Sequence, residues 1–181
     1  GGGVSGLSLA YELQKKGQQV EIIEKSSDNS IFAMLISHGC RRDSEVEITH
    51  TGEGEIELGL SQGQLKLKEK TKILNLLNSA MSARWQDDIK DKQWKKLAVN
   101  CVINPLTAIH DVTNGDILLP KFSKEIDGIL EEFIAVAKAN EITFNFQDLK
   151  KEVLKVAEAT RTNCSSMRAD ILNSRKTEID F

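Results

Sequence analysis

The pattern formed by the first six residues constrains the fold most strongly. Residues 1–6 read GGGVSG and match the pattern G-x-G-x-x-G, and an amphipathic helix is predicted after them, ending at Gly17. Residues 20–25 then read as a strand. A glycine-rich turn, a helix and a strand in this order are typical of a dinucleotide-binding unit, because glycine lets the backbone approach a pyrophosphate and the helix N-terminus attracts its charge. The candidate cofactor-binding residues of this turn are Gly1, Gly3, Val4, Ser5 and Gly6.

The end of the predicted strand carries two residues that point to different cofactors. An acid at this place hydrogen-bonds the ribose 2′-hydroxyl of NAD or FAD, whereas a base accepts the 2′-phosphate of NADP. The chain has both, Glu24 followed by Lys25. Its first 25 residues also resemble the opening of flavin oxidoreductases. The residues alone therefore leave NADP, NAD and FAD open.

A complete Rossmann domain needs more chain than this sequence provides. The first strand would precede Gly1, and only residues 26–30 separate the predicted strand from the next apolar run, at 31–36. Several strand–helix units would normally stand between them. We therefore expect a partial Rossmann domain that lacks its first strand and its middle.

The rest of the sequence predicts a short β region followed by helices. Alternating apolar residues predict a β-hairpin with a glycine-rich turn over 45–60, and residues 71–82 fit a helix. Beyond Arg84 the apolar residues recur at helical spacing. The predicted fold class is α/β plus all-α, with a partial Rossmann dinucleotide-binding domain at 1–84 followed by a helical C-terminal domain, the substrate and catalytic domain, at 85–181.

Charge and composition exclude several functions. With 24 basic and 27 acidic residues the net charge is −3, which argues against nucleic-acid binding. No apolar run is long enough to span a bilayer, and the glycine-rich start is not a signal peptide. The three cysteines and three histidines show no metal-ligand spacing, so we predict no metal site, no disulfide and a cytoplasmic location.

One predicted helix carries a polar stripe that suits a small anion. Lys96, Asn100 and Asn104 stand at four-residue steps and would share one face. An ammonium and two carboxamides fit an oxygen-rich anion. Such stripes are usually only solvated, but asparagine is a poor helix former, so two on one stripe need a reason. We also expect Pro105 to end or kink the helix at Asn104.

The same helix is part of a longer pattern, which resembles the ketopantoate reductase (2-dehydropantoate 2-reductase) family. Residues 94–106 are similar to the start of that family's C-terminal domain, and further segments match in the family's order. The matching segments are SHGCRRD at 37–43, WKKLAVNCVINPL at 94–106, NG at 114–115, NCSSMRADI at 163–171 and RKTEID at 175–180. The resemblance covers about residues 31–181, and the family's last helices would follow Phe181.

The resemblance implies an NADP-dependent oxidoreductase acting on CH-OH groups. It would reduce 2-dehydropantoate to pantoate with NADPH, in pantothenate and coenzyme A biosynthesis, and its active site would lie in the cleft between the two domains. Lys25 stands where the family usually has arginine, which implies NADPH as the cofactor; Glu24 departs from the family. Because so much of the first domain is missing, we expect no steady NADPH oxidation by these 181 residues alone.

The resemblance also implies roles for individual side chains. Lys96 is the candidate acid that protonates the forming alkoxide, and Glu178 is its catalytic partner. Ser166, together with Asn100 and Asn104, would bind the substrate. Simpler explanations exist: Glu178 could open a helix, and Ser166 could cap one. We expect Lys95 to face solvent, Ser165 to be structural and Asn163 to be a cap.

Two alternatives stay open. One is a flavin- or NAD-dependent oxidoreductase with another substrate, which Glu24 favours. The other is a non-catalytic nucleotide-binding interaction module whose helical half only dimerises. The sequence leaves the oligomeric state open, with a homodimer as one outcome, and it does not distinguish ketopantoate from a related 2-keto acid.

Overall fold

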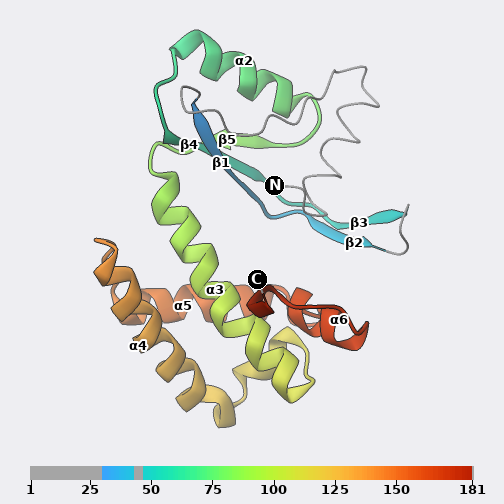
Figure 1. Ribbon diagram of the computed structural model, residues 1–181. Helices are drawn as coiled ribbons and strands as arrows, with labels where there is room; N and C mark the ends of the chain where they lie inside the picture. Colours follow the sequence, from blue (N-terminus) through green and yellow to red (C-terminus); the bar gives the residue numbers. More distant parts are fainter. Residues whose placement is uncertain (1–29, 43–46, 181) are drawn as a thin grey trace. The chain divides into compact units, whose positions relative to one another are not determined.

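The computed structural model of the chain describes residues 30–42 and 47–180, which Figure 1 shows in colour. The chain divides into two compact units, Gly1–Lys92 and Gln93–Phe181. The boundary predicted near Arg84 lies eight residues before this division. The predicted turn, helix and strand of residues 1–25 lie outside the described residues. None of the helices in the described ranges has the length and apolar character that crossing a membrane requires.

Within residues 30–42 and 47–92, the main part of the first unit is a three-stranded sheet with a helix. Its elements are β1 (Ile31–Ile36), β4 (Ile56–Gln62), α2 (Leu67–Asn78) and β5 (Ala83–Trp85). The strand order is β1-β4-β5; β1 and β4 are antiparallel, whereas β5 is parallel to β4 and follows it through α2. Buried side chains of the sheet and of α2 form the core of this unit: Ile56, Leu58, Leu77 and Ala83.

The predicted hairpin over 45–60 is wrong. The strand β3 (Ile48–Gly52) pairs with β2 (Gly39–Arg42) in a separate two-stranded sheet, and β4 pairs with β1 and β5. Alternation identifies strands but does not choose their partners. The apolar residues Ile56 and Leu58, 0% and 2% exposed, place β4 in the middle of the larger sheet, where both of its edges are hydrogen-bonded.

The helix α2 lies four residues before the predicted range of 71–82. Hydrogen bonds at its two ends explain where it begins and ends. At its start the Glu69 carboxylate accepts the Lys66 N–H at 3.0 Å. At its end the Asn78 side chain accepts from the Ala83 N–H at 2.9 Å and donates to the Ala83 carbonyl at 3.0 Å. Asn78 thus links the end of α2 to β5. Residues 79–82, which were predicted to be helical, form the connection between α2 and β5.

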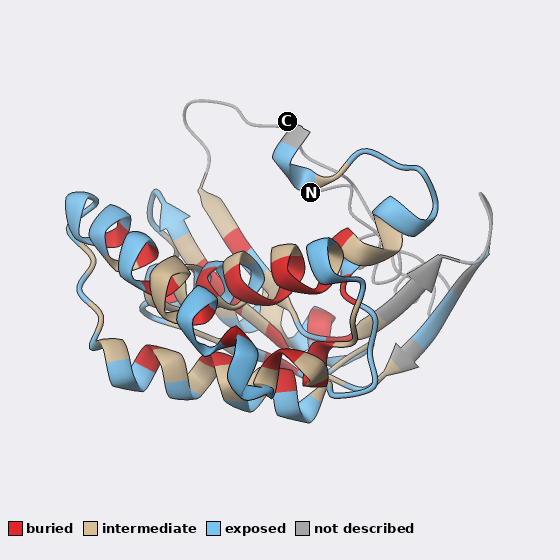
Figure 2. Cartoon of the chain, turned by 90° about the horizontal axis from the view of Figure 1, so that it is seen from below, coloured by how far each residue is buried: buried red, intermediate tan, exposed pale blue. Residues whose placement is uncertain are grey.

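The second unit is helical. Its elements are α3 (Ile89–His110), which starts before the division, then η1 (Asn114–Leu118), η2 (Pro120–Phe122), α4 (Ser123–Ala139), α5 (Phe146–Ala159), α6 (Ser166–Leu172) and η3 (Glu178–Asp180). Buried and exposed residues alternate along these helices, as amphipathic helices require (Figure 2). The core includes Val102, Phe122, Leu130 and Val153, each at most 1% exposed.

The expectation that Pro105 ends the helix at Asn104 is wrong, because α3 continues to His110. A proline inside a helix costs about 3 kcal/mol, since it lacks an N–H and crowds the preceding turn. Val102 and Leu106, on either side of it, are 0% and 2% exposed. Burying each of these side chains contributes about 1.5–3 kcal/mol, so core packing outweighs the cost of the proline.

Gly59 in β4 is a position where a side chain does not fit. A Cβ built there would stand 2.6 Å from the Gln86 carbonyl oxygen and closer still to the Ile89 side chain. Since the backbone of residue 86 cannot easily give way, we expect Gly59→Ala to lower the free energy of unfolding by about 1–3 kcal/mol. Urea unfolding followed by circular dichroism measures the change.

Gly128 provides the matched control. It lies inside α4, and a Cβ there would meet nothing within 4 Å. Gly128→Ala should therefore raise stability by about 0.5–1 kcal/mol, the usual gain for alanine over glycine in a helix. Equal effects at the two positions would contradict the crowding seen around Gly59.

Candidate active site

Asn104 lies at the centre of a polar cluster in the second unit. This side chain of α3 is 6% exposed, and its Nδ2 donates to Glu178 Oε1 at 2.8 Å. The same nitrogen lies 3.3 Å from Ser166 Oγ. The structure therefore brings together three residues that the sequence analysis named as site residues, although 62 and 74 positions separate the partners from Asn104.

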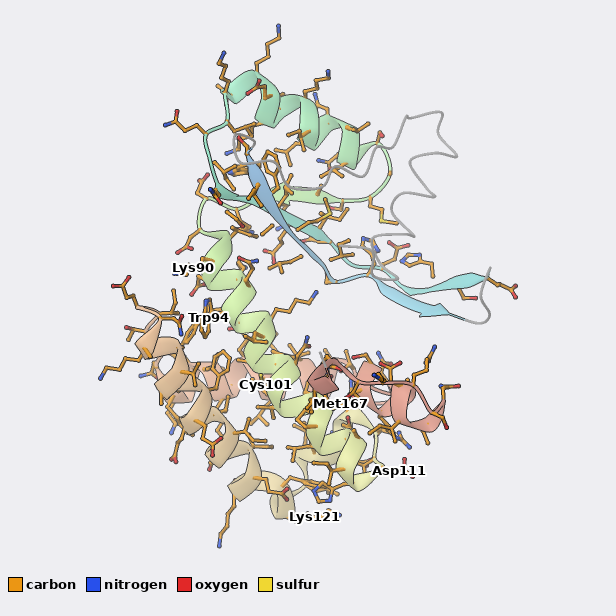
Figure 3. The ribbon with its side chains drawn as sticks, in the orientation of Figure 1. Lys90, Trp94, Cys101, Asp111, Lys121 and Met167 are labelled. Atoms are coloured by element: carbon orange, nitrogen blue, oxygen red, sulfur yellow. The ribbon has the colours of Figure 1, made fainter. Side chains whose placement is uncertain are left out.

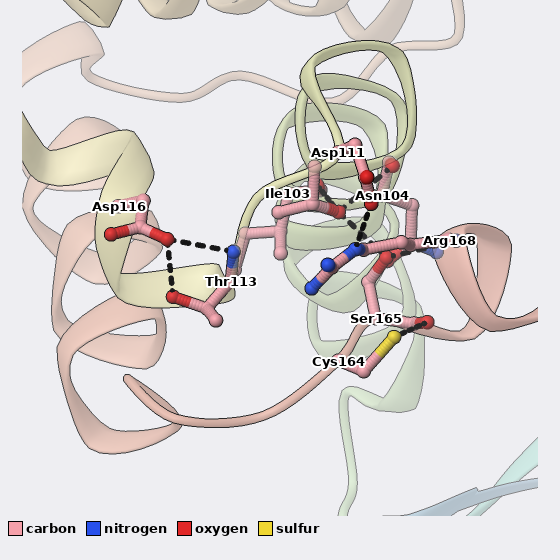
Figure 4. Close-up of polar contacts among 9 residues, drawn as sticks. Ile103, Asn104, Asp111, Thr113, Asp116, Cys164, Ser165 and Arg168 are labelled. Carbon is pink, nitrogen blue, oxygen red and sulfur yellow. Dashed lines mark hydrogen bonds and ion pairs between the residues drawn. The ribbon is translucent and has the colours of Figure 1, made fainter. Parts of the chain in front are cut away.

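A buried pair of hydroxyls fixes the start of α6 against α3. Thr107 Oγ1 and Ser165 Oγ are 2.6 Å apart, and the two residues are 0% and 5% exposed. Thr107 also donates to the Ile103 carbonyl at 2.7 Å, so the Ser165 hydroxyl is the donor between them. Ser165 caps α6 by accepting the Arg168 N–H at 3.2 Å (Figure 4). Ser166, one residue further, is thereby held beside Asn104.

The structural role expected for Ser165 is confirmed, but the one expected for Asn163 is wrong. Ser165 is the N-cap of α6. The Asn163 carbonyl instead accepts the Asn114 N–H at 3.1 Å, and the Gly115 N–H donates to the Arg161 carbonyl at 3.0 Å. These bonds join η1 to the segment after α5. The Asn-Gly pair of the family pattern thus binds the segment that leads into α6.

Lys96 and Asn100, the other two residues of the polar stripe, lie on the same helix as Asn104. Lys96 and Asn100 are exposed on α3, and Asn104 is buried further along it. Eight residues of helix separate Lys96 from Asn104, about 12 Å along the axis. The expectation that Lys95 faces solvent is wrong, because Lys95 is partly buried whereas Lys96 is exposed. The stripe therefore runs from solvent-exposed Lys96 to buried Asn104, whose partners Ser166 and Glu178 are themselves exposed.

Cys101 is a neighbour of this cluster that the sequence did not single out as a site residue. It lies one turn before Asn104 on α3 and is labelled in Figure 3. Burial raises the pKa of the Cys101 thiol, and the negative charge of Glu178 raises it further. The thiol is therefore neutral at physiological pH and adds no second negative charge beside Glu178. Residues three apart on a helix are neighbours, so the spacing of Cys101 and Asn104 was the sequence signal that could have placed Cys101 near the site.

The residues predicted to hold a dinucleotide, including Lys25, lie outside the described residues. The described part of the cluster offers one carboxylate, one carboxamide, one hydroxyl and, further along α3, one more carboxamide and an ammonium. Such a set can bind a small molecule that carries a carboxylate, a carbonyl and a hydroxyl, and it can supply a proton.

Two family models match the chain. Residues 88–181 match the family described as "Ketopantoate reductase PanE/ApbA C terminal", and residues 1–51 match an NAD(P)-binding Rossmann-like domain. The chain is thus α/β plus all-α in class, as expected.

Known proteins are similar to this chain in sequence or in structure. The chain is 38% identical over 164 residues to the 2-dehydropantoate 2-reductase of Vibrio cholerae serotype O1, an alignment that covers 90% of this chain and 55% of that protein. The structure of the probable 2-dehydropantoate 2-reductase of Bacillus subtilis is 29% identical, with a TM-score of 0.63 over 83% of this chain and 50% of that one. A complex of D-mandelate dehydrogenase with NADH, 24% identical, shares the fold with a TM-score of 0.73 over 83% and 52% of the two chains. The chain spans about half the length of the relatives it matches.

Proposed function

Because this chain belongs to the ketopantoate reductase family, we propose that its protein reduces 2-dehydropantoate to pantoate with NADPH, an oxidoreductase reaction at a CH-OH group. The curated relatives named 2-dehydropantoate 2-reductase support the substrate, and the match of residues 1–51 supports a nicotinamide dinucleotide. This reaction would serve pantothenate and coenzyme A biosynthesis in the cytoplasm. A homodimer and the absence of nucleic-acid partners stay predictions.

The observation that carries the proposal is the contact of Asn104 with both Ser166 and Glu178. A buried amide that holds a carboxylate at 2.8 Å fixes the acceptor in one place before any ligand arrives. Such pre-organised groups raise the affinity for a matching ligand, because little motion is lost on binding. The three residues come from α3, α6 and η3, so the cluster exists only in the folded unit.

The charges of the cluster indicate how a 2-keto acid would be oriented. Glu178 repels the substrate carboxylate but can accept a hydrogen bond from a substrate hydroxyl. The carboxylate and the ketone oxygen would instead be bound by the donors of the stripe, Lys96 and Asn100. Ser166 can donate or accept at the remaining position. A bound 2-dehydropantoate offers all three kinds of group.

In the proposed reaction the nicotinamide, when bound, supplies the hydride that adds to the ketone carbon. Lys96 gives a proton to the ketone oxygen as that oxygen becomes an alkoxide, and solvent returns a proton to the amine. Before transfer, the ammonium stabilises the developing negative charge. Glu178 orients Lys96 or the substrate hydroxyl, and Asn104 keeps the Glu178 carboxylate in place.

A hybrid enzyme tests the proposed function. Residues 88–181 would replace the matching part of the Vibrio cholerae reductase, whose own dinucleotide-binding half stays intact. We expect this hybrid to oxidise NADPH when 2-dehydropantoate is added, followed by absorbance, with pantoate as the product. A hybrid that folds and binds NADPH but reduces no 2-keto acid would refute the proposal and favour an interaction module.

The cofactor choice of this chain rests on its own first residues. We propose that Lys25 holds the 2′-phosphate and that Gly1, Gly3, Val4, Ser5 and Gly6 surround the pyrophosphate. Glu24 favours the alternative of NAD or FAD, since an acid binds a free 2′-hydroxyl. Tight binding of FAD by the chain would overturn the assignment to NADPH.

A further inference from the structure

A second cluster of functional side chains lies in the first unit, and none of its members belongs to the cluster around Asn104. His38, His50 and Glu53 each offer one ligand atom, and these atoms all lie within 4.8 Å of one another. His38 follows β1, His50 lies in β3, and Glu53 stands in the connection from β3 to β4. Strand pairing brings them together, which is why sequence spacing predicted no metal site.

The hydrogen bonds of His38 identify the ring nitrogen that could bind an ion. Its ring is 7% exposed, and its Nδ1 accepts the Gly54 N–H at 3.2 Å. A backbone N–H can only donate, so Nδ1 carries a lone pair and the proton of a neutral ring is on Nε2. Within residues 30–42 and 47–180, that Nε2 has no hydrogen-bond partner. The same Nδ1 faces His50 Nε2, so an ion bound between the two rings would take the place of the Gly54 N–H at this lone pair.

The distances also fit a bound ion. His38 Nδ1 lies 3.0 Å from His50 Nε2. Two nitrogens that bind zinc tetrahedrally, each at about 2.0–2.1 Å, are about 3.3–3.4 Å apart, so the rings need to separate by only a few tenths of an ångström. His50 and Glu53 are exposed and can adjust, and they leave an approach for the ion.

The backbone around the cluster is built for close approach. A Cβ at Gly54 would stand 2.5 Å from the backbone nitrogen of His38 and from the Ser37 carbonyl carbon. Only glycine lets the segment that carries Glu53 come so near to His38. The Ser37 hydroxyl adds a further link, because it accepts the Glu55 N–H at 2.8 Å. Three separate pieces of chain are thus held at one point.

We propose that His38, His50 and Glu53 form a binding site for a divalent transition-metal ion of the zinc class. Two imidazoles and one carboxylate are a common zinc ligand set, with a fourth position open to water. Magnesium and calcium prefer oxygen ligands and are excluded by the two nitrogens. The bound ion joins the end of β1 to β3 and to the β3–β4 connection, and so stabilises the two-stranded sheet.

The test is a titration of the purified chain with Zn²⁺, followed by calorimetry. We expect saturable binding that His50→Gln and Glu53→Gln each weaken at least ten-fold, because each removes one of three ligands. His110→Gln is the matched control: this third histidine lies in α3 and pairs with Glu125 at 3.1 Å, so affinity should stay within two-fold of the unaltered chain. Both test positions are exposed, and circular dichroism checks that the variants fold.

Two results would overturn the site. One is the absence of saturable binding at millimolar Zn²⁺; the other is binding that His50→Gln and Glu53→Gln leave unchanged, which places the ion elsewhere. The Co²⁺ spectrum of the unaltered chain decides independently of any variant. Visible bands without thiolate charge transfer support nitrogen and oxygen ligation, whereas thiolate bands assign the ion to cysteines.

Discussion

Replacing Lys96 by alanine in the hybrid reductase should lower kcat by about 10²–10⁴-fold, the usual contribution of a positioned general acid. Alanine removes both the proton donor and the positive charge that stabilises the alkoxide. Because Lys96 is exposed on α3, the fold should not change. Steady-state kinetics with NADPH and 2-dehydropantoate give kcat, and the thermal unfolding midpoint reports on the fold.

Two companion variants separate the parts of this effect. Lys95→Ala removes the neighbouring, partly buried ammonium and should leave kcat within a few-fold of the unaltered hybrid. Lys96→Arg keeps the charge, but a guanidinium does not release its proton at working pH, so kcat should stay low. If Lys95→Ala is the damaging change, the register of the stripe is wrong. If neither lysine matters, the helical half is not catalytic.

Periodicity predicted the elements of this chain better than their partners. The stripe of Lys96, Asn100 and Asn104 lies on one helix as its four-residue spacing indicates. The pairing of β4 with β1 could not be predicted, because alternation is the same for any partner. The continuation of α3 through Pro105 could not be predicted either, because it depends on how much apolar surface the surrounding helices bury.

In the candidate site, too, local patterns in the sequence predicted some features and not others. The segment with Ser166 and Glu178 was identified by its resemblance to a family, not by spacing, since contacts over 62 and 74 positions leave no local pattern. The Thr107–Ser165 hydroxyl pair was missed for that reason. Cys101 was missed for a related reason: its pKa depends on its burial and on the charge of Glu178, and both arise only when the chain folds.

Asn104→Asp should lower kcat/KM for 2-dehydropantoate by about 10²–10³-fold in the hybrid, a loss comparable to that of one well-placed donor. The substitution keeps the shape of the side chain but replaces the Nδ2 donor by an acceptor. Two carboxylates would then face each other where Asn104 now binds Glu178 at 2.8 Å. The repulsion displaces Glu178 and leaves Ser166 with a charged neighbour.

The stability of this variant should depend on pH in a way that identifies the cause. Two adjacent carboxyls cannot both ionise easily, so one folded-state pKa is raised above its unfolded value of about 4. Below the unfolded pKa this carboxyl is protonated, and the variant keeps its full stability. As the pH rises through the raised folded-state pKa, that stability is lost. The loss relative to the unaltered chain should therefore grow from acidic to neutral pH, as measured by urea unfolding. Asn163→Asp, an exposed change, should show no such trend. A loss at Asn104 that is constant with pH would mean that the two side chains are not in contact in solution.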